Sequence, residues 1–237
     1  MNEQEFRRPQ IILTRNLRIP NEYTLGLDGE YRHLAFNEER APANQGQWRK
    51  EIFGVDEDFP MDLEIGTGNG TFFHHYCHTH PQRNVVGVEL KYKPLIQTIR
   101  RNHKLNLSNG RVVRTHAFNL DLVFAAGEIN DIYIHFPDPW VTPRKPKNRI
   151  FNPRMLKLFW NFQRLGSRIH FKTDSREMFD WSLDQIQKSS YKIEFQTRDL
   201  HREPGSEKLF RTQFENIFVG QGLPIYALRM QKCPPSE

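Results

Sequence analysis

The chain lacks the features of a secreted, disulfide-bonded or membrane-spanning protein. Its 237 residues include only two cysteines, Cys77 and Cys233, which lie far apart in the sequence, so we expect no disulfide framework. The mean hydropathy is −0.72, and the charged first residues leave no apolar run long enough for a signal peptide or a membrane helix. We therefore expect a cytoplasmic protein without membrane association, built as one large domain with an appendage.

Acidic residues are missing from two long stretches of the chain. The net charge is +6, and residues 90–120 contain seven Lys or Arg with no Asp or Glu. Residues 140–172 contain nine Lys or Arg and again no acid. A solubilising surface normally mixes both signs of charge, whereas single-sign stretches suit a polyanion. We therefore expect nucleic acid as a partner.

The glycine-rich turn after the first predicted strand lacks one glycine of the dinucleotide fingerprint. Residues 61–65 read as a short apolar strand, and residues 66–70 carry glycines at alternate positions. These glycines permit a positive φ and let a ligand approach the backbone closely. A dinucleotide site requires a further glycine where Thr71 stands, so NAD is disfavoured. Glu89 ends the next predicted strand, where a carboxylate is placed to hold the two hydroxyls of a ribose.

A proline-flanked aspartate follows a third apolar strand. Residues 136–140 read Phe-Pro-Asp-Pro-Trp, and the prolines fix φ near −65° and remove two backbone donors around Asp138. The aspartate is thus aimed by a stiff chain at the end of a strand. The alternative interpretation is a turn with Trp140 packed on the core. The glycine turn, the ribose acid and this corner, in this order, favour a ligand site.

Strand and helix patterns alternate through the rest of the chain. Helices are predicted at residues 93–107, 153–165 and 176–188, with strands beginning at residues 112 and 168. This alternation predicts an α/β fold with a Rossmann-like, doubly wound, mostly parallel sheet, whose ligands bind at the carboxyl ends of the strands. Residues 1–50 are polar and contain three prolines, so we expect an arm with little core of its own. Residues 51–232 then form the main domain, and residues 233–237 a short tail.

Histidines crowd one predicted helix, but no metal site is expected there. His74 and His78 form an i, i+4 pair with the spacing of zinc ligands. No carboxylate or second cysteine completes the set nearby, so we interpret these histidines as part of a solvated helix end. Trp48, Trp160 and Trp181 lie at helical positions and are expected in the core.

Four segments together resemble the bacterial tRNA (guanine-N7-)-methyltransferases. They are residues 64–70, 136–140, 172–174 and 211–215, and the resemblance covers roughly residues 48–230. It implies that residues 51–232 are a domain with the Rossmann-like fold of the S-adenosylmethionine (SAM) methyltransferases. The implied activity is methyl transfer from SAM to N7 of a guanine in the variable loop of tRNA, by a monomer or homodimer.

The resemblance also implies roles for individual residues, carried over position by position. Asp138 is implied as the catalytic residue. The implied SAM contacts are Glu64, Gly66, Gly68, Gly70, Glu89, Asn119 and Asp138. The implied substrate contacts are Thr142, Arg144, Lys147, Asp174, Thr212, Gln213, Phe214 and Glu215.

One position departs from the family pattern. The family usually places a Lys two residues after the Trp of the corner, and this chain has Thr142 there, although Arg144 and Lys147 match the basic run that follows. Two alternatives therefore stay open. One is a SAM enzyme that acts on an exocyclic amine of another RNA or small substrate, since residues 137–140 loosely resemble the corner of those enzymes. The other is a tRNA-binding relative that has lost catalysis.

Overall fold

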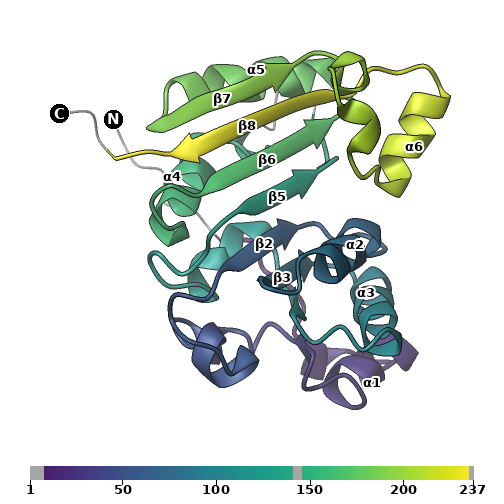
Figure 1. Cartoon of the computed structure of the whole chain (residues 1–237). Coiled ribbons are helices and arrows are strands. Elements are labelled where there is room, and N and C mark those ends of the chain that lie inside the picture. The colour runs from purple at the N-terminus through teal and green to yellow at the C-terminus, as the bar shows by residue number, and fades with distance from the viewer. Residues whose placement is uncertain (1–7, 141–145, 235–237) are drawn as a thin grey trace.

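The computed structural model describes residues 8–140 and 146–234. An eight-stranded sheet runs through the centre in the order β1-β4-β3-β2-β5-β6-β8-β7, as Figure 1 shows for most of its strands. Strand β8 is antiparallel to both of its neighbours, and all other pairs of adjacent strands are parallel. The strands are β1 (Ala35–Phe36), β2 (Met61–Ile65), β3 (Asn84–Glu89), β4 (Gly110–Arg114), β5 (Ile132–His135), β6 (Arg168–Thr173), β7 (Tyr191–Thr197) and β8 (Tyr226–Lys232).

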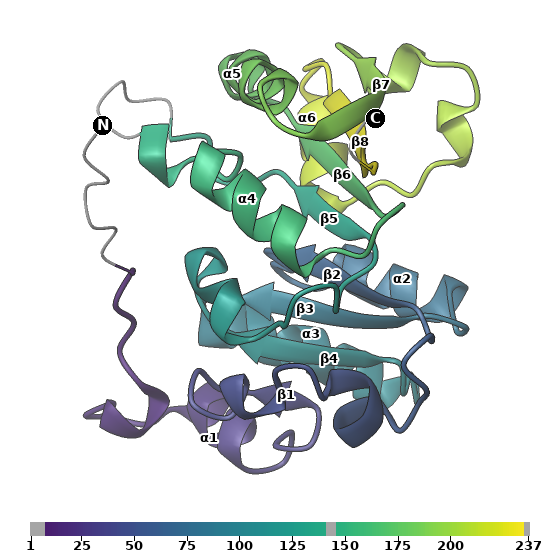
Figure 2. The ribbon, with the colours of Figure 1, turned by 90° about the vertical axis from the view of Figure 1, so that its left-hand side faces the viewer.

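Helices cover both faces of this sheet (Figure 2). On one face, helices α4 and α5 pack with Met61, Leu63 and Ile65 of β2 in the larger core cluster. On the other face, helices α2 and α3 pack with Val85 of β3. The predicted doubly wound, mostly parallel sheet is confirmed. The helices are α1 (Glu22–Asp28), α2 (Thr71–Thr79), α3 (Tyr92–Lys104), α4 (Pro153–Phe162), α5 (Arg176–Gln187) and α6 (Gln213–Gly220).

The strand order reverses between β2 and β5. Strands β3 and β4 follow on one side of β2, whereas β5 and β6 lie on its other side. At such a switch point the loops after neighbouring strands diverge and leave a crevice at the carboxyl edge of the sheet. Ile65 pairs with both Val88 and Ile134, so β2, β3 and β5 end at the same level.

Two helices end earlier than their sequence patterns predict. Helix α3 stops at Lys104 instead of residue 107, because Asn106 takes a positive φ of 53°, which a helix does not accommodate. Helix α4 begins as predicted, with the Asn152 side chain accepting from the Met155 N–H. It ends at Phe162, since the next residue, Gln163, bridges to Ile129 and draws the chain toward the sheet.

Residues 8–50 contribute more to the core than their polar composition predicts. Strand β1 extends the sheet by pairing with β4, and the side chains of Leu27, Ala35 and Trp48 are fully buried. The indole N–H of Trp48 donates to the carbonyl of Val123 at 2.9 Å. The elements here are too short, two residues in β1 and seven in α1, to show a periodic pattern in the sequence.

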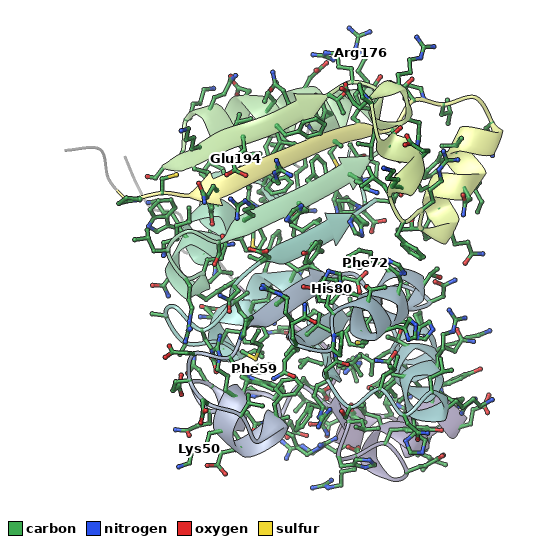
Figure 3. The ribbon with its side chains drawn as sticks, viewed as in Figure 1. Lys50, Phe59, Phe72, His80, Arg176 and Glu194 are labelled. Atoms are coloured by element: carbon green, nitrogen blue, oxygen red, sulfur yellow. The ribbon has the colours of Figure 1, made fainter. Side chains whose placement is uncertain are left out.

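Helix α2 carries the predicted histidine cluster and packs it more closely than a solvated helix end would. His75 stacks on Phe210 with ring centroids 3.9 Å apart, and His80 stacks on Tyr76 at 4.2 Å. Figure 3 shows Phe72 on this helix and His80 directly after its end, and the ring centroids of Phe72 and Tyr133 of β5 are 5.1 Å apart. Among the residues that the structure describes, no three His, Cys, Asp or Glu side chains are grouped as metal ligands. None of the helices in residues 8–140 and 146–234 has the length and apolarity needed to cross a membrane.

Candidate active site

Two glycines of the turn after β2 expose the backbone to a ligand. Gly66 and Gly68 have positive φ values of 81° and 52°, which glycine adopts without strain. The space where a β-carbon would stand is open at both positions, with no described atom within 4 Å. The turn is held to the neighbouring strand β3, since the Gly66 N–H donates to the Val88 carbonyl at 2.8 Å. A ligand can therefore lie directly against this backbone.

Gly70 has a different reason to be glycine. A β-carbon there would lie 2.8 Å from the Cα of Thr98, so the residue allows helix α3 to approach the start of helix α2. Gly70 also takes a φ of 76° as the residue before α2. The packing of two helices thus explains a glycine that was predicted as a cofactor contact.

Glu89 at the end of β3 is fixed by the same turn. One carboxylate oxygen accepts from the Gly68 N–H at 3.1 Å, and the other accepts from the Lys91 N–H at 2.9 Å. Each carboxylate oxygen has a second lone pair, so both remain able to accept from a hydroxyl. The predicted ribose acid is consequently held in one orientation beside the open glycines.

Glu64 is a buried carboxylate whose environment lacks a compensating donor. Its side chain is 2 % exposed, and its Oε2 atom has no hydrogen-bond partner among the residues that the structure describes. Burial, together with the nearby charge of Glu89, raises the pKa of Glu64 well above its ordinary value. A cationic or N–H group of a ligand would supply the missing partner.

Asn119 lies in the 3₁₀ turn Ala117–Leu122 that follows β4. The side chain is 7 % exposed and donates through Nδ2 to the carbonyl of Pro9 at 3.2 Å. Its Oδ1 atom is buried and finds no partner in residues 8–140 and 146–234. Arg8 pairs with Asp121 of the same turn, so the N-terminal segment lies across this end of the site.

These groups fit SAM. Open glycines accommodate the amino acid part of such a cofactor, a fixed carboxylate suits its ribose, and the orphaned acceptors Glu64 Oε2 and Asn119 Oδ1 match its ammonium and adenine amino groups. All of these groups lie at, or shortly after, the carboxyl ends of β2, β3 or β4.

The corner after β5 presents Asp138 to solvent on a constrained backbone. Phe136 and Trp140 take positive φ values of 50° and 42°, which residues with a β-carbon rarely adopt. Such strain persists only where surrounding contacts impose it, and it is common at functional sites. Here the Phe136 N–H donates to the Lys172 carbonyl at 2.8 Å, and the Arg149 guanidinium donates to the Trp140 carbonyl at 3.1 Å. Trp140 is 39 % exposed, so the alternative of a core-packed tryptophan is wrong.

Helix α6 brings the predicted substrate residues beside the glycine turn. Asn69 in that turn donates to the side chain of Gln213, and the Thr212 hydroxyl caps the helix by accepting from the Glu215 N–H at 3.1 Å. Phe214 follows with a ring that is 57 % exposed. The segment Thr212–Glu215 and the glycine turn are far apart in the sequence, so only the fold brings them together.

Glu215 is fully buried and is occupied by other protein groups. Its carboxylate pairs with the Lys172 ammonium, with N–O distances of 3.1 and 3.0 Å, and it also accepts from the Thr212 N–H. This arrangement positions α6 and gives Lys172 a role that sequence reasoning missed. The alternation of β6 places Lys172 on one face of the sheet, but a sequence contains no signal that identifies its partner.

Of the remaining predicted substrate residues, the structure describes Asp174 and Lys147 but not Thr142 and Arg144. Asp174 directly follows β6 and is half-buried, and Ser175 next to it caps α5 by accepting from the Met178 N–H at 3.2 Å. Lys147 is exposed in the short turn Pro146–Asn148. Thr142 and Arg144 fall in residues 141–145, outside the part that the structure describes.

Comparison with known proteins agrees with this geometry. A family described as a putative methyltransferase matches residues 58–228. A tRNA (guanine-N(7)-)-methyltransferase of Bdellovibrio bacteriovorus is 51% identical over 208 residues, which cover 88% of this chain and 100% of that protein. One from Listeria monocytogenes is 35% identical over 184 residues, covering 78% of this chain and 84% of that protein.

Solved structures resemble the chain in fold. The 16S rRNA methyltransferase KamB aligns with a TM-score of 0.59 at 15% identity, over 84% of this chain and 95% of that chain. The antibiotic-resistance methyltransferase Kmr aligns with a TM-score of 0.53 at 14% identity, over 75% and 88%. With full coverage of a relative at 51% identity and a family match across most of the domain, the chain belongs to the tRNA (guanine-N(7)-)-methyltransferases.

Proposed function

We propose that this protein methylates N7 of a guanine in the variable loop of tRNA, acting in the cytoplasm as a monomer or homodimer. Methyl transfer from SAM to N7 of a guanine in tRNA is the activity of its family, and SAM is the methyl donor. The variable loop as the site of methylation and the roles of individual residues are inferred from the position of α6, the cofactor-side groups, Asp138 and Phe214.

The observation that carries the proposal is the position of helix α6 between two parts of the site. Its first residue, Gln213, bonds to Asn69 of the glycine turn. Further along, Phe218 packs against Phe136 of the proline corner with ring centroids 5.4 Å apart. One rigid helix therefore joins the cofactor side to the corner that carries Asp138. A base bound against α6 would lie close to both.

At the cofactor end, the residues act by binding and orienting. Glu89 would hold the ribose hydroxyls, Glu64 would pair with the ammonium group, and Asn119 would accept from the adenine amino group. Gly66 and Gly68 leave room for the chain of the cofactor to pass against the backbone. Such fixed contacts aim the methyl group, and correct positioning of two reactants lowers a barrier by up to about 7–11 kcal/mol in well-oriented cases.

Asp138 acts electrostatically on the guanine. Ring N7 carries a lone pair and no proton, so its attack on a methyl group requires no general base. SAM supplies that methyl group in electrophilic form when it is bound. As the purine gains positive charge, the Asp138 carboxylate stabilises it and accepts hydrogen bonds from the ring and exocyclic N–H groups of guanine. Its strained, proline-flanked backbone keeps this charge in place before the substrate arrives.

Phe214 provides a surface on which the guanine stacks. Its ring is 57 % exposed and lies 6.3 Å from the Phe218 ring, which in turn contacts Phe136. Sequence-specific RNA recognition uses unpaired bases stacked on such aromatic side chains, and a variable loop offers unpaired bases. We infer further substrate contacts from Asp174, Thr212 and Gln213, and from the segment that contains Thr142, Arg144 and Lys147. The buried Glu215 serves the substrate side indirectly, by holding α6 in place through Lys172.

A labelling experiment tests the proposal directly. Bulk tRNA is incubated with the protein and methyl-labelled SAM, and the nucleosides are then separated. Label in 7-methylguanosine is the expected result, whereas label in methylated adenosine indicates transfer to an exocyclic amine, and no label indicates a relative without catalysis. A tRNA transcript whose variable-loop guanine is replaced by adenosine is the matched control, and it should accept no methyl group.

A further inference from the structure

A basic hollow lies between the glycine turn and helix α3, next to the site described above. It has a volume of about 480 Å³ and is open to solvent. It is lined by Asn69 from the turn and by Gln97, Arg100, Arg101 and Lys104 from α3. Figure 1 shows α3 beside α2 on the side of the molecule that carries the glycine turn.

The pattern of α3 explains why cations gather here. Leu95, Ile96 and Ile99 are fully buried and turn one face of the helix toward the sheet. The opposite face is left to polar residues, and this helix carries four of the seven cations of residues 90–120, namely Lys93, Arg100, Arg101 and Lys104. Over its thirteen residues this helix is about 20 Å long, so it presents an extended basic edge instead of a single charge.

Two of the three cations in the hollow are not neutralised by any residue that the structure describes. Arg100 bonds to Tyr31 and lies near Glu22 and Glu30 of the N-terminal region. Arg101 and Lys104 are exposed, and neither forms an ion pair or hydrogen bond within residues 8–140 and 146–234. Unpaired cations that share a hollow repel one another, so an anion bound between them would be stabilised.

One residue links the hollow to the substrate side of the active site. Asn69 lines the hollow and also donates to Gln213 at the start of α6. Phe214, the proposed stacking surface, is the next residue of that helix. A strand of RNA that delivers a base to Phe214 would therefore continue past Asn69 and along α3.

We propose that this basic hollow binds phosphates of the tRNA backbone next to the methylated guanine, with Arg101 and Lys104 as the principal contacts. The proposal rests on the proposed function, since it takes tRNA as the polyanion. An arginine guanidinium binds phosphate oxygens through two parallel N–H bonds, and a lysine ammonium binds them as a point charge. The amides of Asn69 and Gln97 add neutral donors to the same surface.

The test is a double variant of the full chain, Arg101→Gln with Lys104→Gln. Its tRNA dissociation constant is measured by fluorescence anisotropy over a series of salt concentrations, next to SAM affinity and steady-state kinetics. Each lost phosphate contact reduces the slope of log affinity against log salt by about 0.7–0.9. Two contacts correspond to a slope change of about 1.4–1.8 and to affinity weakened roughly tenfold to thirtyfold at 0.15 M salt. The KM for tRNA should rise accordingly, while kcat and SAM affinity stay at wild-type values.

The matched control removes the same two charges elsewhere, through Lys50→Gln with Lys192→Gln. Figure 3 shows Lys50 away from α3, and Lys192 is exposed on β7 at the far edge of the sheet. If the Arg101→Gln, Lys104→Gln variant has the same tRNA affinity and the same salt-dependence slope as this control, the hollow is not a phosphate site. The proposed function is tested separately from the phosphate site, by whether the wild-type protein produces 7-methylguanosine. If the slope changes in the double variant but the wild-type protein produces no 7-methylguanosine, the phosphate site is supported and the proposed reaction is rejected.

Discussion

Replacing Glu215 by glutamine should loosen helix α6 and damage tRNA methylation while leaving SAM binding largely intact. The Glu215 side chain is fully buried, and it is the partner of Lys172, whose side chain is 16% exposed. Glutamine has nearly the same shape and keeps an oxygen for the Thr212 N–H. It removes the negative charge, however, and leaves the Lys172 ammonium without its counter-charge.

The expected cost follows from the burial of this pair. Removing one partner of a buried ion pair costs about 3–5 kcal/mol, because the remaining charge is uncompensated. Lys172 retains some exposure and a contact to the Phe210 carbonyl at 3.4 Å, so the lower end, about 3 kcal/mol, applies here. For a protein of this size, that corresponds to a fall in Tm of about 6–12 °C.

Thermal unfolding and kinetics together check this prediction. Glu194→Gln serves as the control, since Glu194 pairs with Arg168 and Arg229 at the surface (labelled in Figure 3) and such pairs contribute at most about 1 kcal/mol. Adding Lys172→Met to Glu215→Gln removes the orphaned charge and should restore at least half of the lost stability. The reasoning is refuted if Glu215→Gln lowers the Tm no more than Glu194→Gln does.

Four further predictions concern the cofactor side and the corner. Asp138→Asn should reduce kcat strongly and leave the SAM dissociation constant nearly unchanged in calorimetry, and near wild-type turnover would contradict its electrostatic role. Glu89→Ala should raise the SAM dissociation constant roughly tenfold to a hundredfold, since a charge-assisted contact contributes about 1.5–3 kcal/mol; unchanged affinity would remove Glu89 from the site. Burial raises the pKa of Glu64, so between the ordinary carboxyl pKa and this raised pKa the folded cofactor-free protein binds more protons than the unfolded chain. Its free energy of unfolding should therefore fall as the pH rises between these two pKa values. Glu64→Gln should remove this slope in melting curves and weaken SAM binding, and a slope that persists would assign it to another group. Gly70→Ala should cost about 2–4 kcal/mol of stability in denaturant titrations, since its β-carbon would meet Thr98 on a backbone with positive φ; a loss below 1 kcal/mol would show that α3 can move away.

Local features of the site could be predicted because their causes lie within a few residues. The glycines at 66 and 68 were expected to take positive φ, and they do. A helix was expected to start at residue 153, and α4 begins there, with the Asn152 side chain as its cap. Glu89 and the proline corner were expected at strand ends, and β3 and β5 end at those positions. Each of these outcomes follows from backbone sterics or from hydrogen bonds to near neighbours in sequence.

Features that depend on distant partners could not be predicted in this way. Glu215 was expected to face the substrate, but its carboxylate is buried against Lys172, 43 residues away. Residues 8–50 were expected to contribute little core, but β1 completes the sheet beside β4. The hollow along α3 depends on the approach of α3 to the glycine turn, where Gly70 leaves room for Thr98.

The sequence by itself determined the alternation of strands and helices, the glycine turn, the carboxylate at the end of β3 and the stiff proline corner, because these depend on short-range sterics and periodicity. The tertiary structure decided which of these features lie next to one another. The bond between Asn69 and Gln213 joins residues 144 positions apart, and it places the substrate helix against the cofactor turn. Contacts of this kind arise when burial of the two cores brings distant segments together, and no local pattern specifies their partners.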